Sequence, residues 1–289
     1  MPVMPRTRSG RGSAARCLVC LWLMTRPAMA QQRPLLTEDP DPVGEGKMLI
    51  EAGFDHTWTQ RFPVSGLEGN LLRGPLLGLT SGMGSSAELQ VDGLSWSRLA
   101  IRERFDAPFS DIVESRGPST ASVDDIVIGA KARLLRETPS RPSIGLRFAT
   151  RLPNAGNEKG IGTDTMDFFQ SLLIGKSMRS TRVVGNVGMG ILSDPTRGDR
   201  QNDVLTYGFS FVHRLRTFAV VGDVNGWVST RAGTAPPGTD TRGTATLGFR
   251  YPLAQVRLDG GIYTALTASD ERSGVTGGFT WTFDSVLGK

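Results

Sequence analysis

Two histidines, His56 and His213, are the side chains of this sequence best suited to acid–base chemistry near neutral pH. A hydrolase built on either ring would need a nucleophile or an acidic partner close to it. His56 stands between Phe54 and Trp58 at every second position, and His213 follows two phenylalanines at the same spacing. Such a histidine fits a row of surface aromatics better than a catalytic centre. We therefore predict no catalytic residue and keep a hydrolase as an alternative.

Metal and cofactor chemistry find little support in the residue types. The two cysteines, Cys17 and Cys20, both fall within the first thirty residues, and no Cys/His cluster has the spacing of a transition-metal site. Gly160 and Gly162 lack the βαβ setting that a phosphate-binding loop requires. We expect no metal and no cofactor.

The last apolar stretch, residues 275–283, alternates between two environments. Val275, Gly277, Phe279, Trp281 and Phe283 share one face, and three threonines and a glycine share the other. A period of two predicts a β-strand. Further strands are predicted at Met48–Gln60, Asn70–Thr80, Ala87–Arg102, Asp125–Arg136, Ser143–Arg151, Thr165–Met178, Arg182–Leu192, Val204–His213, Thr217–Thr230, Thr244–Tyr251 and Gln255–Leu266. This makes about twelve strands, most of them long enough to cross a bilayer at a tilt.

Two residues mark irregularities in these strands. Pro75 cannot donate a ladder hydrogen bond, so we expect the outer part of its strand to lie at an edge or beyond the lipid. At Gly93 the apolar positions change parity, which predicts a β-bulge.

Connections between the strands alternate in length. Longer ones, rich in Gly, Pro, Asn and Asp, are expected at Phe62–Gly69, Glu103–Ala121, Pro153–Asp164, Ser193–Asn202, Arg231–Thr241 and Ala268–Arg272, with tighter links between them. That alternation is typical of bacterial outer-membrane barrels, in which every second turn is short and periplasmic. We predict an all-β fold: an antiparallel, up-and-down transmembrane β-barrel of about twelve strands, in which the first strand, Met48–Gln60, pairs with the last.

The two faces of the strands differ in charge. A charged side chain on the lipid face is unfavourable, so the charges on the polar face should point into the lumen. Lumen-lining candidates are Glu51, Asp55, Glu88, Asp125, Lys131, Arg133, Arg147, Asp223, Arg250, Arg257 and Asp259. They could line a solute pathway or form a salt-bridge network that fills the barrel, and the network is the favoured interpretation. The predicted aromatic girdle consists of Phe54, Trp58, Phe209, Phe211, Phe249, Tyr251, Phe279, Trp281 and Phe283.

The ends of the chain differ from the strand region. Residues 1–30 combine five arginines, an apolar run over residues 17–24 and an Ala-x-Ala site before Gln31, which predicts a secretory signal peptide. Residues 31–46 are predicted to be a periplasmic lead-in, either mobile or tucked into the barrel mouth, and disorder is favoured over a plug. The barrel is predicted to span residues 47–283, with a tail at 284–289.

The basic charge belongs to the predicted signal peptide. The sequence has 33 Lys and Arg and 28 Asp and Glu, and five arginines but no acidic residue lie within residues 1–30. The remainder is therefore neutral, which argues against a nucleic-acid partner.

Three segments resemble a known family. Residues 123–135 (VDDIVIGAKARLL), 147–156 (RFATRLPNAG) and 159–164 (KGIGTD) are similar to motifs of the outer-membrane proteins named for the MetA pathway of phenol degradation. The resemblance runs from about Pro75 to Phe283. It implies a secreted outer-membrane barrel with a transporter-like role, and it brings no catalytic residues.

These patterns lead to one functional hypothesis. We expect a non-enzymatic, porin-like channel or transporter in the bacterial outer membrane for small solutes, hydrophobic or aromatic ones included. Its expected partners are outer-membrane lipid, the barrel-assembly machinery and a small-molecule solute. A structural or surface-binding barrel without transport is the first alternative, and an outer-membrane hydrolase is the second.

Overall fold

A computed structural model describes residues 32–267, 270 and 272–285 of the chain. The predicted signal peptide and the last four residues of the predicted tail lie outside the described residues. Within the described part, no helix has the length and apolar character needed to cross a membrane.

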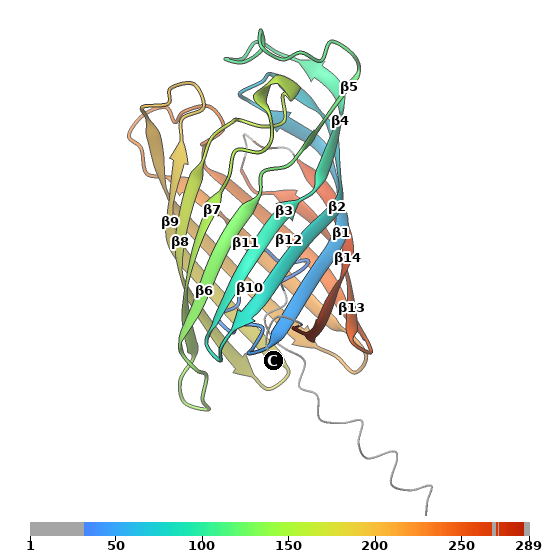
Figure 1. Cartoon of the computed structure of the whole chain (residues 1–289), viewed down its shortest axis with the longest axis vertical. Helices are drawn as coiled ribbons and strands as arrows, with labels where there is room; N and C mark the ends of the chain where they lie inside the picture. The colour runs from blue at the N-terminus through green and yellow to red at the C-terminus, as the bar shows by residue number, and fades with distance from the viewer. Residues whose placement is uncertain (1–31, 268–269, 271, 286–289) are drawn as a thin grey trace, which may run out of the picture.

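The described residues form one antiparallel sheet that closes into a barrel (Figure 1). Its strands are β1 (Lys47–Phe62), β2 (Leu67–Met83), β3 (Ala87–Leu94), β4 (Trp96–Arg104), β5 (Ser119–Val123), β6 (Val127–Leu135), β7 (Ser143–Arg151), β8 (Asp167–Met178), β9 (Thr181–Ser193), β10 (Gln201–Arg214), β11 (Ala219–Ser229), β12 (Arg242–Leu253), β13 (Val256–Ala265) and β14 (Ser273–Asp284). β3 and β4 both pair with β2, so they form two parts of one position in the barrel wall, which we call a stave. β5 and β6 form the next stave in the same way, because β6 pairs with β3 and β5 pairs with β4. The barrel therefore has twelve staves among the described residues, as predicted.

The first and last strands close the barrel. β1 pairs with β14 in a continuous antiparallel register that runs from Lys47 opposite Asp284 to Trp58 opposite Ser273. The other edge of β1 pairs with β2. The sheet is thereby closed into a barrel, and only the short β5, which pairs with β4 alone, keeps an unpaired edge among the described strands.

Of the two strand irregularities predicted from the sequence, the structure confirms one. Gly93 has a φ of +80° and lies where the β2–β3 register shifts, which confirms the predicted bulge. The expectation for Pro75 was wrong, since this proline lies inside β2. There the register with β1 shifts between Gly53 and Asp55, so Pro75 removes no ladder hydrogen bond. The predicted loop Glu103–Ala121 also contains the first part of β5.

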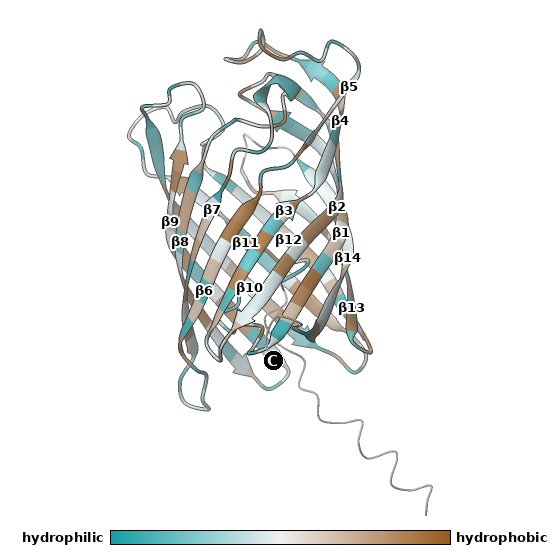
Figure 2. Cartoon of the chain, in the orientation of Figure 1, coloured by the Kyte–Doolittle hydropathy of each residue, from teal (hydrophilic) through white to brown (hydrophobic). Residues whose placement is uncertain are grey.

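The outer surface of the barrel is apolar. Leu247, Phe209 and Ile262 expose 55%, 54% and 60% of their surface and lie on the outward faces of β12, β10 and β13. Figure 2 shows hydrophobic stretches along the strands and hydrophilic loops at the upper end. A soluble protein rarely exposes so continuous an apolar belt, whereas a bilayer covers one. The chain is therefore a membrane-spanning β-barrel.

The connections define the two ends. Residues 84–86, 179–180, 215–218 and 254–255 form tight turns at one end, joined there by the link at residues 136–142. The opposite end carries residues 105–118, 152–166, 194–200, 230–241, 266–267, 270 and 272. The connection between β1 and β2, residues 63–66, also lies at this end but is a short turn, in place of the longer loop predicted at Phe62–Gly69. By the short-turn rule, the first end faces the periplasm.

Candidate functional site: the barrel lumen

The residues before β1 lie inside the barrel, and we call residues 32–46 the inner segment. Its path can be followed from its contacts: Arg33 bonds with β14, Thr37 with β11, Asp39 with β9, Asp41 with β6 and Val43 with β3. The segment thus follows the inner wall strand after strand before it enters β1. The favoured expectation of a disordered N-terminus was wrong for these residues.

The first part of the inner segment is tied to β11–β14. Arg33 donates from Nη2 to the carbonyl oxygen of Gly277, at 2.9 Å, and its Nε lies 3.3 Å from Oδ1 of Asp259. The backbone N–H of Leu36 donates to Asp223 at 3.0 Å, and the Thr37 hydroxyl bonds to the same carboxylate. One inward carboxylate on β11 therefore fixes two consecutive residues of the segment.

The middle of the segment enters a buried ionic cluster. Oε1 of Glu38 lies 2.8 Å from Nε of Arg147, and its Oε2 lies 3.4 Å from Nζ of Lys131. Lys131 is 1% exposed and also contacts Glu88, whose second oxygen accepts the N–H of Val43 at 2.6 Å. Charges buried this deeply need paired partners, and here the inner segment supplies one of them.

The last anchor is Arg182 at the start of β9. Its Nε and Nη2 donate to the two oxygens of Asp39 at 2.5 and 2.7 Å, and Nη2 also donates to Asp41 at 2.9 Å. Nη1 reaches Glu137 at 2.9 Å, on the periplasmic link after β6. Partial burial opposes ionisation of Glu137, but hydrogen bonds from Ser177 together with the Arg182 guanidinium lower the pKa of Glu137 below its ordinary value. The contact of Arg182 with both oxygens of Asp39 is bidentate, and bidentate ion pairs are the strongest.

Nine of the predicted lumen residues contact the inner segment or its ion-pair partners. They are Glu51, Glu88, Lys131, Arg133, Arg147, Asp223, Arg250, Arg257 and Asp259. Asp55 and Asp125 lie elsewhere: Asp55 accepts from Tyr263 at 2.6 Å, and Asp125 lies 3.6 Å from Arg151. Most of the predicted interior charges thus form a network around the inner segment.

The sequence did not predict which residues anchor the inner segment. Arg33, Glu38, Asp39 and Asp41 fell within the predicted lead-in, and Arg182 was taken only as the first residue of a strand. One signal was available: an acidic run of three carboxylates over residues 38–41 precedes a barrel with basic inward positions. Their pairing depends on contacts across 143 residues for Asp39 and Arg182, which no local pattern contains.

The outer mouth of the lumen is narrowed by loops. Leu67, Leu71 and Leu99 face inward from β2 and β4 and pack with Val113 of the loop between β4 and β5. This loop joins the next long loop through a hydrogen bond from the N–H of Glu114 to the carbonyl oxygen of Glu158, at 2.9 Å. Because the covering residues come from loops, strand periodicity did not predict that these inward leucines would be buried.

A large cavity lies on the outer side of the inner segment. It has a volume of about 560 Å³, within the range of small-molecule sites. Apolar and aromatic side chains contribute much of its lining: Leu35, Leu36, Leu76, Phe169, Tyr207 and Trp227. Leu36 is 64% exposed although it lies within the lumen. Charged groups, among them Glu51 and Arg147, occupy other parts of the wall. The chamber can therefore hold a small apolar molecule beside oriented polar groups.

The predicted girdle residues lie on the outside of the barrel at several heights. Trp281 and Phe283 pack with ring centroids 4.6 Å apart near the periplasmic end of β14, and Trp58 lies towards the other end of β1. Phe54 lies near the middle of β1, where it packs against Gly277. Phe209, Phe211, Phe249, Tyr251 and Phe279 occupy positions between the middle of their strands and the periplasmic end.

Both histidines also lie on the outer face. His56 makes an edge-to-face contact with Trp58 at 5.1 Å, and Nδ1 of His213 lies 2.8 Å from the Thr181 hydroxyl. Among the described residues, neither ring is paired with a carboxylate in a way that would activate it for hydrolysis.

Comparison with known proteins establishes the fold. No protein-family model matches the chain, and no curated protein matches it. An outer membrane channel from Pseudomonas putida F1 is similar in structure, with 10% identity and a TM-score of 0.60 over 85% of this chain and 98% of that one. The NanC porin (6% identity, 80% and 98% coverage, TM-score 0.49) and the CymD monoaromatic hydrocarbon channel (10%, 83% and 89%, 0.44) are more distant. The chain has the fold of an outer-membrane β-barrel.

Proposed function

We propose that this barrel is a passive outer-membrane channel or transporter for small solutes, including hydrophobic or aromatic ones. The observation that carries the proposal is the chamber of about 560 Å³ between the outer loops and the inner segment. Its aromatic and aliphatic lining suits a small apolar body, and its few charges can orient a polar substituent. The fold shared with an outer membrane channel supports the same role.

The inner segment is the gate in this proposal. It lies between the outer chamber and a smaller periplasmic cavity, and Gln32, Leu35 and Thr37 contribute to the walls of both. A solute that crosses the barrel must therefore pass the segment. Membership of the MetA-pathway phenol-degradation family, inferred from residues 123–135 and 147–164, is part of the same proposal.

A reversible lock tests the gate. A Cβ built on Gly208 would lie 3.4 Å from Cβ of Thr37, close to the separation of about 3.5–4.5 Å found in disulfides. We therefore propose the double variant Thr37→Cys/Gly208→Cys in the chain from residue 31, which has no other cysteine.

The assay is flux of toluene and of a small polar solute into liposomes that contain the refolded protein. The oxidised lock should reduce flux and a reductant should restore it, while each single cysteine variant should respond to neither treatment. Liposomes that stay as tight as protein-free ones, with wild type and reduced lock alike, would refute the channel. Flux that is equal in the oxidised and reduced double variant would refute the gate.

A further inference from the structure

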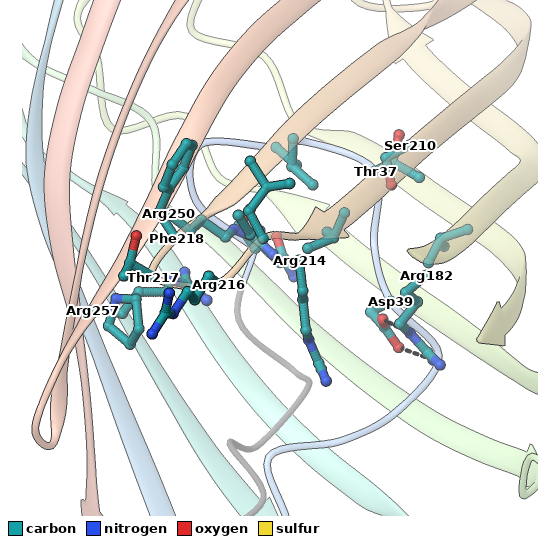
Figure 3. A pocket seen from close by; sticks show the side chains of 17 residues that line it. Thr37, Asp39, Arg182, Ser210, Arg214, Arg216, Thr217, Phe218, Arg250 and Arg257 are labelled. Atoms are coloured by element: carbon teal, nitrogen blue, oxygen red, sulfur yellow. Dashed lines mark hydrogen bonds and ion pairs between the residues drawn. The ribbon is translucent and has the colours of Figure 1, made fainter. Parts of the chain in front are cut away.

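A second cavity lies at the periplasmic end of the lumen, outside the chamber described above. It has a volume of about 230 Å³ and lies between the inner segment and the lumen-facing residues of β9–β13 (Figure 3). An engineered cavity of about 150 Å³ is enough to hold a benzene ring. The space therefore fits a molecule with one aromatic ring and a substituent.

Arginines make up most of the charged lining of this cavity. Arg182, Arg214, Arg216, Arg250 and Arg257 all contribute to it, whereas Asp39 is the one carboxylate among the described lining residues. That carboxylate is already engaged by the guanidinium of Arg182 (Figure 3).

Two of these arginines also contact the inner segment. Nε of Arg250 and Nη2 of Arg257 donate to the carbonyl oxygen of Arg33, at 2.8 and 3.1 Å, and Nη2 of Arg257 lies 3.8 Å from Glu51. These contacts orient the two guanidinium groups at the cavity wall. The turn between β10 and β11 adds Arg216, which makes no ion pair among the described residues. The cavity therefore presents several guanidinium donors, and of its described lining residues Arg216 is the one that is left to pair with a bound anion.

The remaining wall is apolar. Leu35 and Val184 are buried, and Val212, Leu215, Phe218 and Pro252 contribute the other apolar side chains of the lining. An inorganic anion would gain nothing from these side chains. A molecule with an apolar body and one anionic group would satisfy both parts of the lining.

We propose that this cavity binds a small amphiphilic organic anion of the aromatic carboxylate class. The carboxylate would bind at the arginines, whose planar guanidinium groups form paired hydrogen bonds with carboxylates, and the ring would lie against Leu35 and Val212. The proposal rests on the channel function for its role, since a site at this level is the last that an inward-moving solute meets. Binding itself does not require transport.

Calorimetric titration of the detergent-solubilised, refolded chain tests the proposal with benzoate as the probe. Benzoate should bind, whereas benzyl alcohol, benzylamine and formate should bind at least tenfold more weakly. Arg216→Gln should weaken benzoate binding by roughly tenfold, because a charged hydrogen-bonding partner is lost. Val212→Phe, which fills the cavity, should abolish it. Arg141→Gln is the matched control: it removes an exposed charge from another periplasmic link, does not line the cavity, and should leave binding unchanged.

The outcomes separate this proposal from the channel function. Absence of benzoate binding to a protein that conducts toluene in liposomes would overturn the anion site alone. Binding by a protein that conducts nothing would support the site and overturn the channel. Equal affinity for benzoate and benzyl alcohol, equal losses in Arg216→Gln and Arg141→Gln, or unchanged binding in a folded Val212→Phe variant would each refute the proposed site. Folding of every variant is checked by its heat-modifiable migration on a gel.

Discussion

The ion pair between Asp39 and Arg182 is expected to hold the inner segment against the barrel wall. Asp39→Asn keeps the shape of the side chain but removes its charge and replaces one acceptor oxygen by an NH₂ group that faces Arg182. Hydrogen bonds to charged groups contribute about 1.5–3 kcal/mol. Arg182 keeps Asp41 and Glu137 as partners, so the larger loss of about 3–5 kcal/mol, expected when a buried charge is left unpaired, does not apply.

This free-energy change sets the size of the expected effect. Since about 1.4 kcal/mol corresponds to a factor of ten, the undocked fraction of the segment should rise about 10- to 100-fold. Val43 is 4% exposed in the docked segment, so a cysteine at this position reports undocking. The rate at which a maleimide labels Val43→Cys should rise by the same factor when Asp39→Asn is added, provided that docking is faster than labelling.

A matched control separates docking from net charge. Asp199→Asn removes one carboxylate from an exposed loop at the outer end, and it should leave the labelling rate of Val43→Cys unchanged. An increase in channel conductance should accompany faster labelling in Asp39→Asn. Labelling of Asp39→Asn at the rate of the Asp199→Asn control would show that this ion pair does not hold the segment, and the reasoning would fail.

Three further predictions concern the barrel wall. Lys131→Met leaves the buried carboxylates of Glu38 and Glu88 without their shared cation, so it should lower the free energy of unfolding by about 3–5 kcal/mol. Urea titration of the protein in lipid vesicles measures this change, and a loss below about 1 kcal/mol would contradict a paired interior network. Leu247→Arg, at an outward position in the middle of β12, should lower the free energy of unfolding by about 2–4 kcal/mol. Leu266→Arg, just beyond the end of β13, should lower it by only about 0–1 kcal/mol, and equal losses in the two variants would argue against the depth at which these residues are placed in the bilayer. His56→Ala and His213→Ala should leave fatty-acid release from vesicles at the protein-free background, as in wild type; turnover by wild type that either variant abolishes would favour a hydrolase.

Alternation along the strands was enough to predict the wall of this protein. In residues 275–283, each inward position lies opposite a lumen residue or the inner segment, and each outward position faces lipid, because a strand places successive side chains on opposite faces. The same rule placed Lys131 and Asp223 inside and Leu247 outside. Gly93 was recognised as a bulge because a change of parity is itself a local pattern.

Contacts between distant segments could not be predicted in this way. Pro75 is tolerated inside β2 because the register with β1 shifts beside it and because, on the other side, the pairing with β4 ends at Arg73 and the pairing with β3 begins at Leu77. Leu71 and Leu99 are buried inside the mouth because loop residues happen to cover them. The inner segment has the composition of a disordered lead-in, and only its complementary partners hold it in place.

The sequence alone thus determined the barrel, its closure between β1 and β14, and the division of its residues between lipid and lumen, because these depend on a two-residue period and on chain connectivity. The tertiary structure decided what the lumen contains. Glu38, Asp39 and Asp41 are paired with Arg147, Arg182 and Arg133 only once the strands have closed around them. Ion pairs between residues far apart in the chain have no sequence period, so the docked inner segment and the two cavities beside it became visible only in three dimensions.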